Sequence, residues 1–248
     1  MKNVEIHSER ADIETSSKEY GKRFSGEIGQ FFLNTQTKHL FELLGDNHDL
    51  TILDVGGGHA QIAMPLVRNG YDVTVVGSSP KCRERLAELL KPGSYRYQTC
   101  NLLQLPFAEN SFDVAIAFRL LTHEKNWKLQ LVEMCRVAKR MVIVDYPDLR
   151  SFNILYNQLF RFKKAYEKDT RPYKSFSRKE LVMVLNDNHF GNPVPKPQFF
   201  LPMVLHRKMK NVFLSRFFEQ FFSLVGLNEL FGSPVILKVT SLYLNLIT

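Results

Sequence analysis

Five short segments rich in apolar and β-branched residues constrain the fold of this chain more than any other feature. They are Thr51–Val55, Asp72–Val76, Tyr95–Thr99, Phe112–Ala117 and Met141–Asp145. Helical patterns separate several of them, and strands that alternate with helices predict βαβ units and a parallel sheet. The apolar runs are largely continuous, which predicts a sheet covered by helices on both faces.

The helices expected around these strands follow the spacing of apolar residues. They are predicted at Gly26–Leu44, His59–Asn69, Lys81–Leu90 and Lys128–Ala138. Pro65 lies inside the second of these segments, where a proline removes a backbone hydrogen bond, so we expect a kink or a late helix start there. Residues 1–19 are polar and are expected to form a mobile lead-in.

The pattern loosens after Asp145. Further helices are predicted at Ser151–Tyr166, Arg178–Leu185 and Met203–Val225, and a last strand at Val235–Thr240. Pro193, Pro195 and Pro197 interrupt the chain ahead of a short apolar stretch, Phe199–Leu201. With 248 residues, of which 44% are apolar, the chain can close one sizeable core, so we expect a single domain.

Composition excludes several classes of protein. No run approaches the roughly 20 apolar residues that span a bilayer, and the first 14 residues lack the apolar core of a secretory signal. Cys82, Cys100 and Cys135 are odd in number and widely spaced, which fits a reducing compartment better than a disulfide framework. We therefore expect a cytoplasmic protein. The seven histidines and three cysteines lack paired spacings, so no metal site is predicted.

The net charge of +8 is unevenly distributed. Residues 1–149 hold 18 Lys and Arg against 19 Asp and Glu, whereas residues 150–248 hold 15 against 6. The second part also contains 13 of the 20 phenylalanines. The basic excess serves solubility or attracts an acidic partner, which is a phosphate-bearing substrate, an anionic membrane surface or nucleic acid.

The segment LDVGGGHA, Leu53 to Ala60, joins the first predicted strand to the first crossover helix. Glycines at such a turn let the backbone approach a ligand closely, and a helix N-terminus offers unpaired N–H groups. The ligand would lie at the carboxyl ends of the strands. Taken alone, the turn also fits a plain tight connection between a strand and a helix.

The spacing of the glycines separates two classes of nucleotide-binding turn. Gly56 and Gly58 fit the first two positions of the dinucleotide pattern G-x-G-x-x-G, but Gln61 occupies the third. Asp54, Gly56 and Gly58 match the acidic-x-G-x-G-x-G turn of the class I S-adenosylmethionine-dependent methyltransferases, with Ala60 in place of the last glycine.

Three further segments carry the same resemblance. Leu105–Phe118 is similar to the family's stretch into its fourth strand, Arg119–His123 to the loop beneath the sulfonium, and Val142–Pro147 to the fifth strand. The chain thus resembles this family from about Tyr20 to Pro147. The resemblance implies a doubly wound α/β fold, a Rossmann-like seven-stranded and mostly parallel sheet with an antiparallel last strand, and S-adenosylmethionine as cofactor.

The resemblance also implies a cofactor site. Asp54 would orient the turn and the amino acid end of the cofactor, and Phe118 would supply main-chain contacts. Asn101 aligns with an acid near the adenine and Leu102 would pack on the ring, although a turn residue and core packing explain these two as well. The expected set is Asp54, Gly56, Gly57, Gly58, Gly77, Ser78, Asn101, Leu102 and Phe118.

One position departs from the family. The second strand normally ends in an acid that binds both ribose hydroxyls, whereas here Gly77 is followed by Ser78 and Ser79. A serine hydroxyl is a weaker, single substitute for a carboxylate. The same absence argues against a nicotinamide enzyme, which also uses that acid.

The resemblance places His123, Asp145, Arg119 and Tyr20 near the methyl group as candidate catalytic residues. Methyl transfer to an acceptor gains mostly from positioning and exclusion of water. A base is needed only if the acceptor loses a proton, and His123 suits that role because it titrates near neutrality. Structural explanations stay open: a hydrogen-bonded His123, an ion pair at Arg119, and Tyr20 fastening the lead-in.

The predicted helix Met203–Val225 has an apolar face that includes Phe213, Phe217 and Phe221, and a second face rich in Lys and Arg. Its first interpretation is a core helix or a roof over the acceptor pocket. Its second is an interfacial helix whose phenylalanines enter lipid while its cations meet anionic headgroups. A dimer contact is the third.

These observations predict an S-adenosylmethionine-dependent methyltransferase for a small or lipid-like acceptor, neutral or anionic, with contact to a membrane surface as an open alternative. Residues 1–147 would form the lead-in and the cofactor-binding core, and residues 148–248 a helical cap and the final strands of the same domain. A catalytically silent binding protein is the runner-up. A nucleic-acid methyltransferase ranks third, so no nucleic acid is expected as partner.

Overall fold

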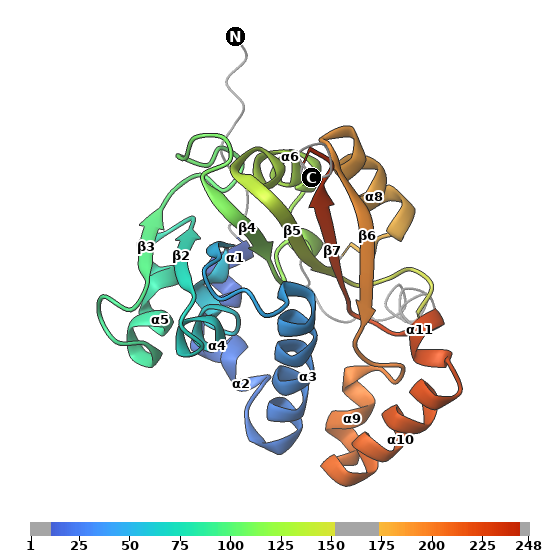
Figure 1. Ribbon diagram of the computed structural model, residues 1–248. Coiled ribbons are helices and arrows are strands. Elements are labelled where there is room, and N and C mark those ends of the chain that lie inside the picture. The colour runs from blue at the N-terminus through green and yellow to red at the C-terminus, as the bar shows by residue number, and fades with distance from the viewer. Residues whose placement is uncertain (1–10, 152–173, 244–248) are drawn as a thin grey trace.

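The computed structural model describes residues 11–151 and 174–243. Seven strands form one sheet in the order β3-β2-β1-β4-β5-β7-β6 (Figure 1). They are β1 (Thr51–Val55), β2 (Asp72–Gly77), β3 (Arg96–Thr99), β4 (Phe112–Ala117), β5 (Ala138–Tyr146), β6 (Phe190–Pro197) and β7 (Val235–Ser241). The pairs from β3 to β5 are parallel, and β7 is antiparallel to both neighbours. The doubly wound, mostly parallel fold is confirmed.

Helices cover both faces of this sheet, as its continuous apolar strands predict. The α-helices are α1 (Ala11–Thr15), α2 (Lys18–Lys22), α3 (Gly26–Leu44), α4 (Ala63–Arg68), α5 (Glu84–Leu89), α6 (Trp127–Val137), α8 (Arg178–Asp187), α9 (Met203–Met209), α10 (Val212–Leu224) and α11 (Leu227–Phe231). Ile52 and Val114 join the apolar cluster under α3, α4 and α5. Leu53 and Ala115 join the one under α6 and α8. Neighbouring residues of a strand thus supply two separate cores.

The first crossover helix begins late, as Pro65 predicts. A 3-10 turn, Gly57–His59, follows β1, and α4 begins only at Ala63. Pro65 is then the third residue of the helix, where its missing N–H has no intrahelical partner to lose.

The prediction that residues 1–19 form a mobile lead-in is wrong for the part that the structure describes. Residues from Ala11 onward form α1 and α2, and the buried side chains of Ala11, Asp12 and Thr15 attach α1 to the rest of the molecule. Residues 1–10 and the predicted helix at 152–166 lie outside the described residues.

The sequence prediction missed β6. Pro193, Pro195 and Pro197 indicated an interruption, but all three lie within a strand. This strand is the outermost member of the sheet, where one side needs no hydrogen-bonding partner and proline is tolerated. The apolar stretch after it is not a strand: Phe199 leaves the sheet and packs on Phe32, with ring centroids 5.2 Å apart.

The predicted helix Met203–Val225 is wrong as a single element. Lys210 adopts a left-handed conformation, with φ of 50°, and divides it into α9 and α10. The carboxylate of Glu219, buried on α10, accepts hydrogen bonds from the amides of Phe200 and Leu201 and contacts His206 Nε2 at 2.8 Å. These hydrogen bonds of Glu219 attach the polar face of α10 to the rest of the molecule.

The apolar face of α10 therefore points away from the molecule. Phe213, Phe217 and Phe221 are 77%, 55% and 50% exposed, and Leu224 is 87% exposed. The interpretation of this stripe as core is wrong. In Figure 1, α9 and α10 lie at the end of the sheet toward which β6 points, beside α3.

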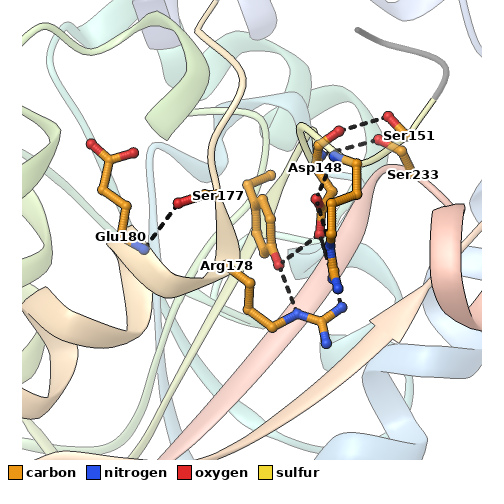
Figure 2. Close-up of polar contacts among 8 residues, drawn as sticks. Asp148, Ser151, Ser177, Arg178, Glu180 and Ser233 are labelled. Carbon is orange, nitrogen blue, oxygen red and sulfur yellow. Dashed lines mark hydrogen bonds and ion pairs between the residues drawn. The ribbon is translucent and has the colours of Figure 1, made fainter.

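A second polar cluster fixes the chain after β5 (Figure 2). The Asp148 carboxylate is buried and accepts hydrogen bonds from the Arg150 guanidinium, while Arg178 lies 3.9 Å away. The main chain of Asp148 is held by the hydroxyls of Ser151 and Ser233. Arg150 and Arg178, two of the cations in residues 150–248, thus interact with a buried carboxylate of the protein itself.

Among the described residues, no helix combines the length and apolarity needed to cross a membrane.

We expect Phe199→Ala to lower the free energy of unfolding by about 3–5 kcal/mol, because the ring is buried. Phe217→Ala should change it by no more than about 0.5 kcal/mol, since that side chain is largely exposed. Urea denaturation of both variants tests the assignment of faces. A large loss for Phe217→Ala would show that the stripe is covered.

Candidate active site

The glycine turn after β1 leaves no space for side chains. Gly56 has φ of +72°, and a Cβ atom on it would lie 2.8 Å from the Leu120 side chain. A Cβ on Gly58 would lie 2.4 Å from the carbonyl oxygen of Cys82. The turn is thus buried and closely packed, and only glycine fits it at the carboxyl ends of the central strands, the edge at which ligands bind in such sheets.

Asp54 lies directly beneath this turn. Its carboxylate is fully buried, and neither oxygen accepts a hydrogen bond of ordinary geometry from any described residue. Burial raises the pKa of Asp54 to about 7, and the backbone amide of Ala63 opposes this only weakly. An unsatisfied buried acid is costly and marks a place where a ligand cation or donor would be stabilised.

The end of β2 is crowded as well. A Cβ on Gly77 would lie 2.5 Å from Tyr97 Oη and 2.8 Å from Cys82 Cβ. The structure therefore has no space for an acidic side chain at position 77. Ser78 instead donates from its amide and its hydroxyl to Asp12 of α1, each at 2.6 Å. Sequence reasoning missed Asp12, because no local pattern links α1 to β2.

The expected adenine-side residues show mainly structural contacts. Asn101 is exposed, and its side-chain oxygen accepts from the Leu103 amide, the bond of a local turn. Leu102 is buried in the core. The Phe118 carbonyl lies 3.4 Å from Nε2 of His59, which sequence reasoning did not select although it belongs to the glycine motif.

His59 is neutral. Burial, reinforced by the positive charge of Arg119, lowers its pKa to about 3. Its Nδ1 accepts from the Gln61 amide at 3.1 Å, so Nε2 carries the proton and points to Phe118. The ring thereby braces the glycine turn against the end of β4.

Three of the four predicted catalytic residues come together. The amide of Arg119 donates to Asp145 Oδ1 at 2.5 Å, and its guanidinium donates to Tyr20 Oη at 3.5 Å and to Gln36 Oε1 at 2.7 Å. The guanidinium also lies 4.0 Å from the centre of the Phe24 ring. Burial raises the pKa of Asp145 to about 6, which the charge of Arg119 moderates.

His123 lies at the end of a 3-10 turn, Leu121–His123, and its amide donates to the Leu120 carbonyl. The bonds that join Tyr20, Arg119 and Asp145 do not include it. Its role as a base stays a prediction.

A cavity of about 580 Å³ opens between α2, α3 and α9. Its lining residues are Lys22, Arg23, Ser25, Gly26, Glu27, Ile28, Gly29, Arg207 and Lys210. Burial lowers the pKa of Arg207, and the charges of Arg23 and Arg119 lower it further. Arg23 and Arg119 both act on Arg207, and both also contact Tyr20.

Comparison with known proteins agrees with this geometry. The methyltransferase domain family matches residues 53–144. A demethylmenaquinone methyltransferase of Tropheryma whipplei is 26% identical over 190 residues, which cover 68% of this chain and 78% of that protein.

Two solved structures share the fold. Magnesium protoporphyrin IX methyltransferase from Synechocystis, with S-adenosylhomocysteine bound, gives a TM-score of 0.62 at 16% identity over 92% of this chain and 97% of that one. Geranyl diphosphate C-methyltransferase from Streptomyces coelicolor gives 0.58 at 20% over 84% and 79%. Residues 53–144 belong to the methyltransferase domain family, and the chain has the fold of the class I S-adenosylmethionine-dependent methyltransferases.

The methyltransferase uses S-adenosylmethionine as methyl donor. Two features of the site fit this group: Gly56 and Gly58 place no side chains at the turn, and the buried carboxyl of Asp54 next to it has no hydrogen-bond partner of ordinary geometry among the described residues. When bound, the cofactor supplies a methyl group on a cationic sulfonium. The glycine turn, the buried carboxyl of Asp54 and the Arg119 group are this chain's candidates for positioning the reactants and limiting access of water.

We expect the contribution of Asp54 to the free energy of unfolding to fall as pH rises from about 4 to 7, while buried His59 contributes in the opposite direction, so the effect is measured against a variant that lacks the Asp54 carboxyl. The folded state keeps this proton up to about pH 7, whereas the unfolded chain releases it near 3.8. The shift corresponds to at most about 4 kcal/mol, so Asp54→Asn should be more stable than wild type at pH 8 and similar at pH 4.

Urea denaturation at pH 4 and pH 8 measures this difference. The exposed Asp46→Asn variant is the control and should keep the wild-type pH dependence. Parallel behaviour of Asp54→Asn and wild type across this range would contradict the buried, unpaired state of the carboxylate.

Proposed function

We propose that this methyltransferase acts on a small, lipophilic acceptor that carries an anionic group. The observation that carries the proposal is the cavity beside Arg119, which is lined by Lys22, Arg23, Arg207 and Lys210 and by one acid, Glu27. A volume of about 580 Å³ is within the range of small-molecule sites. The surplus of positive charge selects an acceptor of opposite sign.

The same charges favour the chemistry of an acidic hydroxyl. Nearby cations lower the pKa of an acidic group and stabilise its ionised form, which is the better nucleophile toward a sulfonium methyl. Arg119 and Tyr20 are placed by their mutual hydrogen bond to orient such an oxygen. Asp145 positions Arg119, and His123 stays our candidate for accepting a proton when the acceptor arrives protonated.

The exposed face of α10 supports a lipid-like acceptor. It presents Phe213, Phe217 and Phe221 to the outside, next to the exposed cations Lys208 and Lys210. An apolar stripe bordered by cations suits the surface of an anionic membrane. Because Lys210 also lines the cavity, an acceptor dissolved in that surface would have a short path into it.

The names of two similar proteins also support a lipid-like acceptor. One is a demethylmenaquinone methyltransferase and one a geranyl diphosphate C-methyltransferase, so the names give a quinone and a prenyl diphosphate as the acceptors of those two proteins.

Residues 148–248 form, in this proposal, one domain with residues 1–147. β7 pairs with β5 along six residues, from Met141 to Tyr146, and so completes the sheet that the first part begins. The cap is the part of this segment that carries α9, α10 and α11, and it would set the choice of acceptor.

We expect Arg207→Gln to raise KM for an anionic acceptor by about 10-fold or more, since a partly buried ionic contact is lost, while cofactor affinity stays unchanged. The matched control is Lys208→Gln, one residue along α9 and absent from the cavity lining. The assay uses demethylated quinones, prenyl diphosphates and phenolic acids as acceptors. Equal KM values for both variants would exclude this cavity as the acceptor site.

Vesicle binding tests the membrane part of the proposal separately. Phe213→Ser and Phe217→Ser should weaken co-sedimentation with phosphatidylcholine vesicles that contain phosphatidylglycerol, whereas Leu129→Ser, at an equally exposed leucine of α6, should not. Neutralising Lys208 and Lys210 together should matter most at low salt, because exposed charges are screened within about 8–10 Å at physiological ionic strength. Binding that none of these changes affects would restrict the enzyme to acceptors in solution.

A further inference from the structure

The end of β2 lacks its acid for a steric reason. Tyr97 on β3 donates from Oη to the Ser79 carbonyl at 2.7 Å, which fixes its ring across the position where a side chain on residue 77 would emerge. Cys82 closes the other side. Glycine at 77 is therefore required by the packing of β2 on β3 and on the 3-10 turn Pro80–Arg83.

A carboxylate nevertheless reaches the end of β2. Asp12 comes from α1, 66 residues away in sequence, and its side chain is almost completely buried. Its Oδ2 accepts from the Ser78 amide at 2.6 Å and from the Cys82 thiol at 3.3 Å, and its Oδ1 accepts from the Ser78 hydroxyl at 2.6 Å. The acid thus lies one residue beyond the position where the family carries its own.

The neighbours of Asp12 act as hydrogen-bond donors to its carboxylate oxygens. Burial and then the charge of Asp12 raise the pKa of the Cys82 thiol to about 12 and that of Cys100 to about 11, so both thiols stay protonated and Cys82 can donate. A carboxylate offers about four acceptor positions, and the described residues use three of them at Asp12. Acceptor capacity remains for a ligand hydroxyl.

α1 also contacts the glycine turn. Ser16, directly after the helix, has its hydroxyl 2.2 Å from where a Cβ on Gly58 would stand. A cofactor bound along this turn would therefore lie beside α1. Asp12 either takes part in binding the cofactor or competes with it, and these two roles predict opposite effects of removing its charge.

We propose that Asp12 replaces the missing acid and holds a ribose hydroxyl of the cofactor. The bonds from Ser78 fix its carboxylate at the end of β2, and the crowding around Gly77 explains why the acid is supplied by the lead-in. The proposal rests on the cofactor of the family and is independent of the acceptor.

Calorimetric titration with S-adenosylhomocysteine, in the absence of any acceptor, tests this role. Asp12→Asn should weaken binding by about 10- to 100-fold, the effect of losing a charge-assisted hydrogen-bond acceptor. The control is Glu19→Gln, which removes the same charge from exposed α2 and should bind as wild type does. A 2′-deoxy analogue of the ligand should bind more weakly to wild type, and Asp12→Asn should discriminate little between the two ligands.

Tighter binding by Asp12→Asn would overturn the proposal, because α1 would then be a plug that competes with the cofactor. Unchanged binding would overturn it as well. If Asp12→Asn does not fold, Ser78→Ala decides, since it removes one bond that orients the carboxylate. The preference of Ser78→Ala for the 2′-hydroxyl should fall, and a wild-type preference would contradict the role of Asp12.

Discussion

The carboxyl ends of β1, β2 and β4 meet so closely that side chains have almost no space there, and the rest of the molecule adapts to this crowding. Leu120, Cys82 and Tyr97 fill the positions that Cβ atoms on Gly56, Gly58 and Gly77 would need. Only glycine fits these three positions, so none of them places a side chain at the edge where a ligand would bind. Chemistry at this edge must come from side chains on neighbouring segments.

Buried carboxylates are the main candidates for that chemistry, and they differ in how many hydrogen bonds they accept. Asp54 has no described donor and a raised pKa, whereas Asp145 receives the amide of Arg119. Asp12 is bonded at both oxygens, and Glu219 binds two amides and a histidine in the cap. A buried charge is tolerated where donors surround it, so the unsatisfied one is the best indicator of a ligand.

The cap reverses the usual arrangement of an amphipathic helix. α10 is held by Glu219 and Ser215, so its phenylalanines face outward. An apolar surface of this kind costs free energy in water and is kept where it contacts a partner or a membrane. The neighbouring cavity is lined mainly by cations, and these two features together are the basis of our proposal that the acceptor is apolar and negatively charged.

The sequence by itself predicted most strands of the sheet and the succession of strands and helices along the chain, because their periodicities are local properties. It also predicted the cofactor turn, because the glycine spacing of Asp54–Gly58 is local too. It misread β6 because whether a strand is outermost, and so tolerates three prolines, depends on pairing with β7. It misread the face of α10, since hydrophobicity indicates which residues share a face and not which face is covered. Only the tertiary structure brought Asp12 to Ser78 and Tyr20 to Arg119, contacts between residues 66 and 99 positions apart that no local pattern encodes.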